Sequence, residues 1–551
     1  MLVTLILKAF AAVTILAATT SLGMILAANR RTAILKRANP NLTVHAVLIP
    51  PYSILTLLGL IPSWIKLKFP RDWMWHRKFS QFESCTDSIF AICTYNSTSV
   101  HVAHPHLAHE IMVNRYKEFL KPVHHYHIVD IYGKNIVSTE GDEWRRHRKV
   151  AAPTFSEQNN AYVYESSVQT AQRMFTAWEQ TSVSGTNGVK EHRVNVSNDM
   201  MEFALSVISS AGFGIDVSWH TEEDKSEFRI KKGNTLSFKQ ALETVVNRLP
   251  YYIITPRPLF YLPIKYLQDT KRGFVEFESY LDQIIDDAES ETSTEKPKNV
   301  IFLPVKHGDI LILSSIPKLL QMLAQSTFSQ KSEESKMTKS ELKGNSFVFI
   351  LAGHETTAGV LTYALTMLAI HPEKQSKLFH DIKQQLGNTT IPEYKDIPKL
   401  RYALAVMNET MRLFPPVTSI PKFTAAQTLS LGQFVFPAQT MVNIAIAALH
   451  YNPVAWGEDT FAFKPERFMV AEGETPGAQF SRPGFAPFSE GPRGCLGKKF
   501  AQVEFLTLLA LLSLNYTWRL PEGAKIEDML DSGQVVTLKP KQSIELLFSR
   551  R

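Results

Sequence analysis

The segment Phe488–Phe505, which reads FSEGPRGCLGKKFAQVEF, constrains what this chain can fold into more than any other part of its sequence. An irregular loop containing Gly and Pro delivers Cys495 to the start of a helix-forming run. A thiolate at a helix N-terminus is favoured by the helix dipole and by backbone N–H groups without helical partners. Gly491 and Gly494 permit tight turns, and Gly497 lets a flat ligand approach without a Cβ in the way. The segment therefore predicts a reactive sulfur beside a flat ligand.

The cysteine count favours ligand binding over cross-linking. The 551 residues contain three cysteines, Cys85, Cys93 and Cys495, and such an odd, sparse set indicates a reducing compartment. Arg493 adds a cation suited to a carboxylate. A deprotonated sulfur with one open face is what haem iron needs from a protein, because thiolate donation favours O–O cleavage. The alternative is a buried structural cysteine in a turn.

The N-terminal run Ala9–Ala28 has no charged residue, and about 20 helical residues span the ~30 Å hydrocarbon core of a membrane. A cleaved signal peptide is the rival interpretation. The run is longer than a typical signal core, however, and basic residues follow it in place of a small-residue cleavage site. These residues are Arg30, Arg31, Lys36 and Arg37. By the positive-inside rule we expect a single-pass anchor at residues 1–29, with the following chain in the cytosol.

Residues 30–64 are predicted to form a basic, proline-containing linker close to the membrane. The apolar stretch Val44–Ile61 lies within this linker and contains Pro50-Pro51. Because proline breaks a spanning helix, we do not expect this stretch to cross the membrane. This stretch is either a hinge on the membrane surface or an ordinary buried segment.

Residues 65–551 contain no linker and no internal repeat, which predicts one large domain with mainly helical periodicity. Strand-like runs occur in a few places, for example Ser88–Thr94, Thr440–Leu449 and Val535–Phe548. The polar segments Ser290–Lys298 and Ser329–Ser340 are typical of loops. The apolar run Val300–Leu313 between them is either a strand or an insertion.

The charge and the histidines of the chain bear on two other functions, nucleic-acid binding and zinc binding. The formal net charge of +7 is not collected in one long run, so anionic lipid or an acidic protein fits as well as nucleic acid, and we predict no nucleic-acid partner. Two histidine groups suggest zinc: His101, His104, His106 and His109, and then His124, His125 and His127. No cysteine has the required spacing and Pro105 interrupts the first group, so we expect solvent-exposed histidines.

The apolar stretch Leu342–Ile370 predicts a helix of about 40 Å, long enough to cross a domain. It carries AGHETT at Ala352–Thr357. Gly353 removes side-chain bulk, while Glu355 and Thr356 place an acid and a hydroxyl in the core. Burying both is costly unless they serve a purpose; the alternative is a core helix whose polar residues are satisfied.

Two spacings place side chains on one helical face. Glu409 and Arg412 lie three residues apart and can pair. Trp144 and Arg148, in WRRHR, lie four residues apart, and an arginine fork suits a carboxylate. An ordinary surface arginine is the alternative for Arg148.

These motifs together resemble the cytochrome P-450 family. The family's haem-binding loop reads Phe-x-x-Gly-x-Arg-x-Cys-x-Gly, which is matched in full by Phe488, Gly491, Arg493, Cys495 and Gly497. AGHETT and the context GDEWRRHRKVAAPTF are also similar, and the chain looks closest to microsomal fungal members. The resemblance implies a mainly α fold with a small β region, and haem b between two long helices. This haem domain would occupy residues 65–551, behind one N-terminal transmembrane helix.

The resemblance also implies roles for single residues. Cys495 is expected to be the axial ligand of the haem iron. Ala352 and Gly353 are expected to border the cofactor in the family's oxygen-binding groove, where Glu355 and Thr356 route protons to the oxygen.

Further roles concern the surroundings of the haem. Trp144 and Arg148 are expected to hydrogen-bond a haem propionate. The family's buried charge network corresponds to Glu409, Arg412 and Arg467. Lys422 stands where many members carry arginine, which puts its propionate contact in doubt, and the turn at 437–440 must form without the usual glycine.

The function implied is insertion of one oxygen atom from O₂ into a lipophilic small molecule, with electrons from NADPH through a separate cytochrome P-450 reductase. The location implied is the endoplasmic reticulum membrane, and fungal members of this kind often serve secondary metabolism. A basic patch suited to an acidic partner, or ordinary solvated charges, would be formed by Arg145, Arg146, Lys149, Lys498 and Lys499. The rivals are a non-oxygenating haem-thiolate isomerase or dehydratase, which would not need Glu355 and Thr356, and a non-catalytic haem sensor.

Overall fold

The computed structural model describes most of the chain, which divides into two compact units. The first unit comprises Met1–Pro122, Ala405–Cys495 and Leu530–Lys541, and the second comprises Val123–Leu404, Leu496–Met529 and Gln542–Arg551. The described residues are 2–50, 67–70, 72–180, 183–184, 190–214, 219, 231, 233–293, 322–323, 326–327, 336–425, 427–469, 483–534 and 536–551. The apolar run 300–313 lies outside these ranges, as do residue 51 of the Pro-Pro pair, the linker after it and parts of 290–298 and 329–340.

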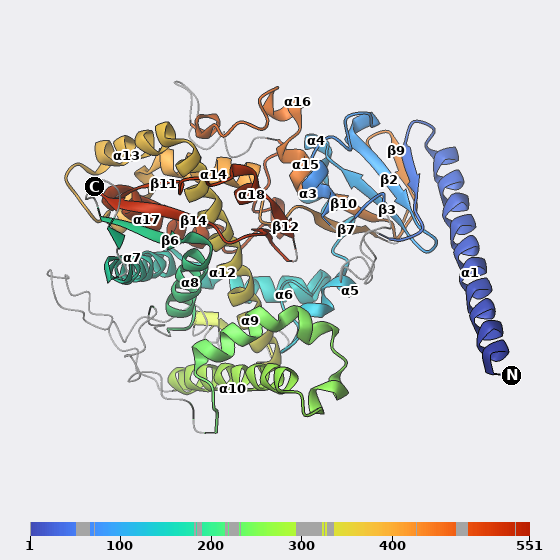
Figure 1. Ribbon diagram of the computed structural model, residues 1–551, viewed down its shortest axis with the longest axis horizontal. Helices are drawn as coiled ribbons and strands as arrows, with labels where there is room; N and C mark the ends of the chain where they lie inside the picture. Colours follow the sequence, from blue (N-terminus) through green and yellow to red (C-terminus); the bar gives the residue numbers. More distant parts are fainter. Residues whose placement is uncertain are drawn as a thin grey trace. The chain divides into compact units, whose positions relative to one another are not determined.

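A six-stranded sheet organises the first unit (Figure 1). β2 pairs antiparallel with β3, while β10 runs parallel to β3 and antiparallel to β7. The sheet therefore joins segments from the two halves of the sequence. In spatial order its strands are β1 (Thr43–Ala46), β2 (Ile89–Cys93), β3 (Thr98–Val102), β10 (Met441–Ile444), β7 (Ile420–Thr424) and β4 (Phe119–Leu120).

The inner strand β2 is buried on both faces, in agreement with its continuous apolar sequence. Its odd-numbered residues pack into an aliphatic core with β3 and β10. On the other face Phe90 contacts Trp73 at 5.7 Å and stacks on His101 at 5.0 Å between ring centroids. His101 is fully buried and burial lowers its pKa to about 3, so the expectation of a solvent-exposed histidine is wrong at this position.

Predicted strands in the C-terminal third are only partly correct. β10 ends at Ile444 and the helix α15 (Ile446–His450) follows, because the two alanines of α15 favour a helical turn over an extended strand. The run 535–548 contains two strands in different sheets, β13 (Leu538–Pro540) and β14 (Glu545–Arg550). Gln439 makes the turn before β10 with φ of +60°, a left-handed conformation that glycine adopts more readily.

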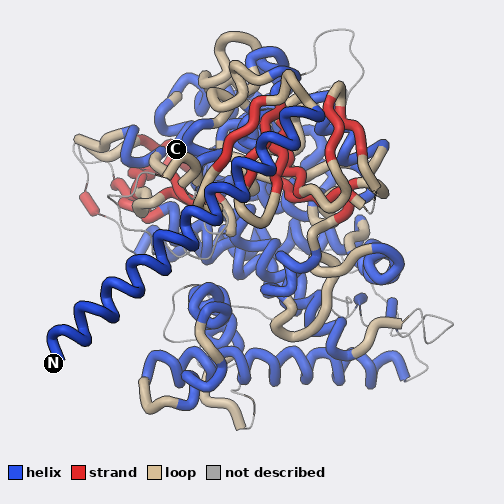
Figure 2. The backbone as a smooth tube through the Cα atoms, turned by 90° about the vertical axis from the view of Figure 1, so that its right-hand side faces the viewer, coloured by secondary structure: helices blue, strands red, loops and turns tan. Residues whose placement is uncertain are grey.

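The remaining elements of the first unit are short, except for α1 (Leu2–Ala38), whose C-terminal turns lie against β1 and β2 (Figure 2). They are α3 (Trp73–Arg77), η1 (Thr86–Ser88), α4 (Pro105–His109), η2 (Glu110–Asn114), β8 (Leu429–Leu431), β9 (Phe434–Phe436), α16 (Pro453–Trp456), η10 (Pro465–Phe468), η12 (Gly491–Arg493) and β12 (Ser532–Gln534). The helix α14 (Arg401–Leu413) enters this unit at Ala405.

The second unit is mainly helical, with one four-stranded sheet. The sheet has the order β11 (Tyr516–Arg519), β14, β6 (Lys190–Asn195) and β5 (Val183–Ser184), and all its pairs are antiparallel. Its helices are α5 (Val123–Tyr126), η3 (His127–Val129), α6 (Gly141–Ala151), η4 (Ala152–Thr154), α7 (Glu157–Gln180), α8 (Val196–Ile208), η6 (Ser209–Phe213), α9 (Phe238–Ile254), η7 (Arg257–Tyr261), α10 (Lys265–Ser293), α12 (Lys339–Ile370), α13 (Pro372–Leu386), η9 (Tyr394–Lys399), α17 (Lys498–Asn515) and α18 (Ile526–Leu530).

The long helix α12 confirms the prediction for Leu342–Ile370 and begins three residues earlier. Thr338 and Glu341 form a capping box, in which each side chain accepts a hydrogen bond from the other residue's backbone N–H. α12 packs against α8, α10 and α17. It is long and apolar enough to cross a membrane, but 72% of its most apolar window is buried, so it is a core helix.

Candidate active site

The loop before Cys495 folds tightly in the first unit. Gly491 begins the turn η12 with φ of +66°, and a Cβ on this residue would lie 2.6 Å from the Met112 carbonyl oxygen. A side chain there would require the backbone to move. The Cys495 N–H donates to the Phe488 carbonyl at 2.9 Å, which fixes the cysteine at the end of a closed loop.

The three cysteines differ in their surroundings. Cys495 is exposed, whereas Cys93 is buried and Cys85 is half-buried. Burial raises the pKa of the Cys85 and Cys93 thiols, which disfavours their thiolates. Gly497 is the N-cap residue of α17, which begins three residues after Cys495. Cys495, the cysteine in the predicted loop, is thus the most exposed of the three.

Two basic residues of the same unit are poorly solvated. Lys422, on β7, is 4% exposed, and burial lowers its pKa to about 8. No carboxylate pairs with Lys422 within the described residues. Burial likewise lowers the pKa of Arg493 to about 10. A ligand that carries carboxylates would stabilise both cations, so a thiolate donor with these two residues fits a haem and its propionates.

Glu409, Arg412 and Arg467 are brought together as predicted. The Arg412 guanidinium donates to both Glu409 carboxylate oxygens at 2.7 Å, and both side chains are fully buried. Arg412 also donates to the carbonyls of His450 and Thr460 at 3.0 and 2.7 Å. The Arg467 Nε lies 3.5 Å from Glu409 Oε1. These bonds connect α14 with the segment that precedes the cysteine loop, so the role of the network is structural.

In the second unit, α12 presents one open stripe. Ala352 is exposed and Thr356 half-buried, although most of the helix is covered. The Thr356 hydroxyl donates to the Ala352 carbonyl at 2.8 Å, and Glu355 beside it is 9% exposed. Gly353 faces α8, because a Cβ there would lie 3.3 Å from Ile208 Cδ1. The open stripe of small residues fits a flat ligand.

Trp144 and Arg148 both lie on α6. The Arg148 guanidinium lies over the Trp144 ring, 5.7 Å from its centroid, while Trp144 is buried. The two side chains therefore share one helical face, as their spacing predicts.

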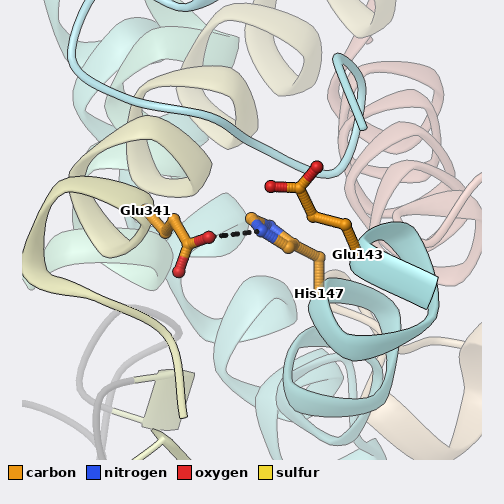
Figure 3. Close-up of side chains that lie close together, drawn as sticks. All are labelled: Glu143, His147 and Glu341. Carbon is orange, nitrogen blue, oxygen red and sulfur yellow. Dashed lines mark hydrogen bonds and ion pairs between the residues drawn. The ribbon is translucent and has the colours of Figure 1, made fainter. Parts of the chain in front are cut away.

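Arg146 belongs to a buried cluster and is not a free surface charge, which corrects the predicted basic patch. Arg146 donates to both carboxylate oxygens of Glu341. His147 also contacts Glu341, with Nε2 at 3.3 Å from Oε1 (Figure 3). Asn345 Nδ2 lies 2.9 Å from His147 Nδ1. Burial opposes ionisation of Glu341, but bonds from Arg146 and His147 outweigh it and hold its pKa well below the ordinary value.

The same cluster is the one group of possible metal ligands that the described residues bring together. Ligand atoms of Glu143, His147 and Glu341 lie within 4.8 Å of one another, but both Glu341 oxygens already accept hydrogen bonds from Arg146, as described above. A second cation would be repelled there. Neither predicted histidine group gathers three ligand atoms among the described residues, and His124, His125 and His127 are exposed.

Comparison with known proteins identifies the family. The family model described as Cytochrome P450 matches residues 55–548. The chain belongs to the cytochrome P450 family. It is 32% identical to "Cytochrome P450 monooxygenase 124" of Postia placenta, over 87% of this chain and 88% of that protein. The "Phomenoic acid biosynthesis cluster cytochrome P450 monooxygenase" of Leptosphaeria maculans is 27% identical, over 82% of this chain and 79% of that protein.

The P450 fold is shown by structure as well as by sequence. The crystal structure of the cytochrome P450DA heme domain matches 92% of this chain and 98% of its own, with a TM-score of 0.68 and 20% identity. The expected mainly α fold with small sheets is thereby confirmed. The protein is a P450 monooxygenase, whose cofactor is a haem with an axial cysteine thiolate.

Two features of this P450 were not predicted. Glu504 is a lone acid in the apolar run of α17 and is fully buried. The partnership of Glu341 with α6 was also missed. A sequence signal existed for both, because an acid inside an apolar helix is rare and Thr338-x-x-Glu341 is a capping-box pattern.

Proposed function

We propose that residues 1–29 anchor this P450 in the endoplasmic reticulum membrane and that the chain after them forms a cytosolic haem domain. Residues 43–46 of the expected linker belong to that domain, because they form β1 of its six-stranded sheet. The domain takes electrons from an NADPH-dependent P450 reductase and oxygenates a lipophilic small molecule. The observation that carries the proposal is that Cys495 is an exposed residue at the end of the family's closed loop. A place in secondary metabolism is supported by the relative whose name includes a biosynthesis cluster.

In this proposal the loop and the buried cations hold the cofactor. Cys495 supplies the axial thiolate, while Phe488, Gly491 and Gly497 shape the loop around it. Arg493 and Lys422 bind the propionates from the first unit, because both are cations that burial destabilises. Trp144 and Arg148 bind a propionate from α6. The haem, when bound, supplies the O₂ and one-electron chemistry.

In this proposal, residues of the open stripe of α12 deliver protons to the bound oxygen. Thr356 offers a hydroxyl on the half-buried side of the helix, and the Ala352 carbonyl fixes its orientation at 2.8 Å. Glu355 is the acid that resupplies the proton, and Gly353 lets α12 and α8 approach each other. A hydroxyl held in this way can pass a proton without a large rearrangement.

Thr356→Ala is expected to keep haem binding and NADPH consumption but to lose product. With the reductase present, much of the reducing power should appear as hydrogen peroxide, because the proton needed for oxygen transfer is no longer delivered. General acid assistance contributes about 10²–10⁴ in rate, and water can replace part of it. Product and peroxide per NADPH are the quantities to measure.

Two variants control this experiment. Thr356→Ser keeps the hydroxyl and should keep most of the coupling. Thr362→Ala loses the same type of bond two turns along α12, where the Thr362 hydroxyl donates to the Ala358 carbonyl at 2.8 Å. Unchanged coupling in Thr356→Ala would favour the non-oxygenating isomerase or dehydratase, and no NADPH consumption by the wild type with the reductase would favour the haem sensor.

The membrane anchor is supported by exposed apolar side chains on α1. Large side chains of this helix are 57–65% exposed at Ile15, Leu16, Leu22 and Leu26. Lys36 and Arg37 lie in its last turn. An apolar helical segment whose large side chains are exposed, followed by cations, is typical of a segment that lipid surrounds.

A second apolar surface lies between α9 and α10 in the second unit. Its exposed side chains include Ile254, Leu259, Tyr261, Leu262 and Ile264. The Lys271 ammonium lies 3.7 Å from the Tyr261 ring centroid, so a cation borders the apolar surface. This combination suits contact with a membrane surface.

The proposed topology predicts the result of protease treatment. In sealed microsomes, added protease should digest everything beyond about Arg30, because the basic residues after the anchor keep the domain on the cytosolic side. The fragments can be followed by immunoblotting against the C-terminus. Protection of the domain, or glycosylation at Asn515-Tyr516-Thr517, would contradict the topology.

The proposed reductase surface uses exposed cations of the second unit. Arg145, Lys149, Lys498 and Lys499 are exposed, and Arg145 also pairs with Asp142 on α6. An acidic partner would be attracted by such residues, in a manner that weakens with salt. The substrate class rests on the family: the segment Val417–Ile420 lines the pocket of other members, and Val417 is 40% exposed here.

A further inference from the structure

The excess positive charge of this chain comes from the residues that precede Asp72. Asp72 is the first acidic residue of the sequence, and eight of the 59 lysine and arginine residues lie before it. The rest of the chain has 51 basic against 52 acidic residues, so the net charge of +7 arises entirely from the N-terminal segment. Such a segment is attracted to anionic surfaces, and the fold shows where its cations come together.

Three cations from different parts of the first unit act on His45, which lies on β1. The Lys68 ammonium is 2.9 Å from His45 Nδ1, and the Arg77 guanidinium on α3 donates to the Lys68 carbonyl at 2.6 Å. Burial, followed by the charges of Lys68, Arg77 and Lys36, lowers the pKa of this histidine to about 4. We call Lys36, Lys68 and Arg77 the basic cluster.

The basic cluster has donors left for a ligand. No carboxylate pairs with its three cations in the part of the chain that the structure describes. Lys68 uses one of its three N–H groups on His45, and Arg77 uses two of its five on the Lys68 carbonyl and on Gln81. Lys36 and Lys68 are exposed. Unpaired ammonium and guanidinium groups together suit an oxyanion such as a phosphate ester.

The C-terminal end of α1 is fixed beside this cluster. Asn39 is buried; its Nδ2 donates to the Val435 carbonyl at 2.9 Å, and its Oδ1 accepts from the Val435 N–H at 2.7 Å. Residues 39–42 alone separate α1 from β1, which pairs with β2. Lys36 lies about 12 Å along the helix from Ala28, the last residue of the charge-free run. This distance brings the cluster close to the headgroup layer of a membrane that α1 enters.

We propose that the basic cluster binds the phosphate of an anionic phospholipid, with Lys68 and Arg77 as its main donors. Lipids and soluble metabolites both carry phosphate esters. The lipid is favoured because Lys36 lies on the same helix as the exposed apolar side chains of α1, which can pack against acyl chains. The inference rests on the proposed role of α1 as a membrane anchor.

Native mass spectrometry of the full-length holoprotein tests the site. The detergent micelles contain either dioleoyl phosphatidic acid or the same amount of dioleoyl phosphatidylcholine. The wild type should retain phosphatidic acid preferentially. Lys68→Ala/Arg77→Ala should weaken this retention roughly 10- to 30-fold at low salt, because a cation near an anionic surface contributes about a fivefold effect. Equal retention of the two lipids by the wild type, or undiminished preference in the double variant, would overturn the proposal.

Lys117→Ala/Lys525→Ala is the matched control, since it removes two exposed lysines that lie outside the N-terminal segment. Lipid retention should not change in this variant. A loss as large as that of Lys68→Ala/Arg77→Ala would mean that overall charge attracts the lipid, which contradicts a site. If Arg77→Ala does not fold, Lys68 carries the test: Lys68→Glu should remove the preference for phosphatidic acid, and Lys68→Arg should keep it.

Two further measurements separate the possible sources of phosphate and the two proposals. Glycerol 3-phosphate has the phosphate without acyl chains, so a tenfold excess over phosphatidic acid should not displace the bound lipid. Displacement would assign the cluster to soluble phosphate esters and overturn the lipid. Flotation with phosphatidylcholine vesicles tests the anchor by itself. A wild type that does not float would contradict the proposed anchor, whereas the effect of the Lys68 variants in micelles would still decide whether the cluster binds phosphate.

Discussion

Cys495→Ser abolishes the red-shifted Soret band of the reduced, carbon monoxide-bound protein and all monooxygenase activity: this is the largest effect that we expect. The band depends on a sulfur donor to the haem iron, and a serine hydroxyl does not ionise to replace a thiolate at neutral pH. Cys495 is also the exposed cysteine, at the end of a closed loop. The measurement is the reduced, carbon monoxide difference spectrum of purified protein.

Cys85→Ser and Cys93→Ser are the matched controls, because they make the same atomic change at half-buried and buried sites. Both should keep the band. Cys93→Ser should lower the thermal midpoint slightly, since Cys93 lies on the fully buried strand β2. Retention of the band in Cys495→Ser, with its loss in either control, would show that a different cysteine binds the iron.

Arg412→Leu is expected to have the second largest effect, a loss of about 3–5 kcal/mol in the free energy of unfolding, because it leaves a buried carboxylate without its partner. Arg412 and Glu409 are both fully buried, and burial already raises the pKa of Glu409 in spite of the pair. The network reaches the segment before the cysteine loop, so haem retention should fall as well. Thermal unfolding and haem content per protein are the measurements.

Arg519→Leu provides the control for Arg412→Leu. It makes the same change at an exposed pair, in which Arg519 Nη2 lies 2.9 Å from Glu191 Oε2. Surface pairs contribute at most about 1 kcal/mol, so stability should hardly change. The double variant Glu409→Leu/Arg412→Leu should recover part of the loss, because the buried carboxylate is then also removed, while Arg467 keeps its pair with Asp459. A mild effect of Arg412→Leu, similar to that of Arg519→Leu, would contradict a central role for the network.

Features encoded over short stretches of chain were predictable. The α12 helix follows from a long apolar run and a capping pattern, and the Glu409–Arg412 pair from a spacing of three residues on one helix. The loop before Cys495 follows from glycine at the position where the backbone adopts a left-handed conformation. In each case the residues that determine the structure are close together in the sequence, so the local sequence pattern is enough to predict it.

Features that depend on packing were decided only by the tertiary structure. Arg146 looked like a surface charge until folding placed Glu341 beside it, and His101 like a solvated histidine until aromatic rings enclosed it. The 440–449 run changes from strand to helix after Ile444. Burial and pairing depend on which distant segments of the chain come into contact. The spacing of residues along the chain does not show which segments these are.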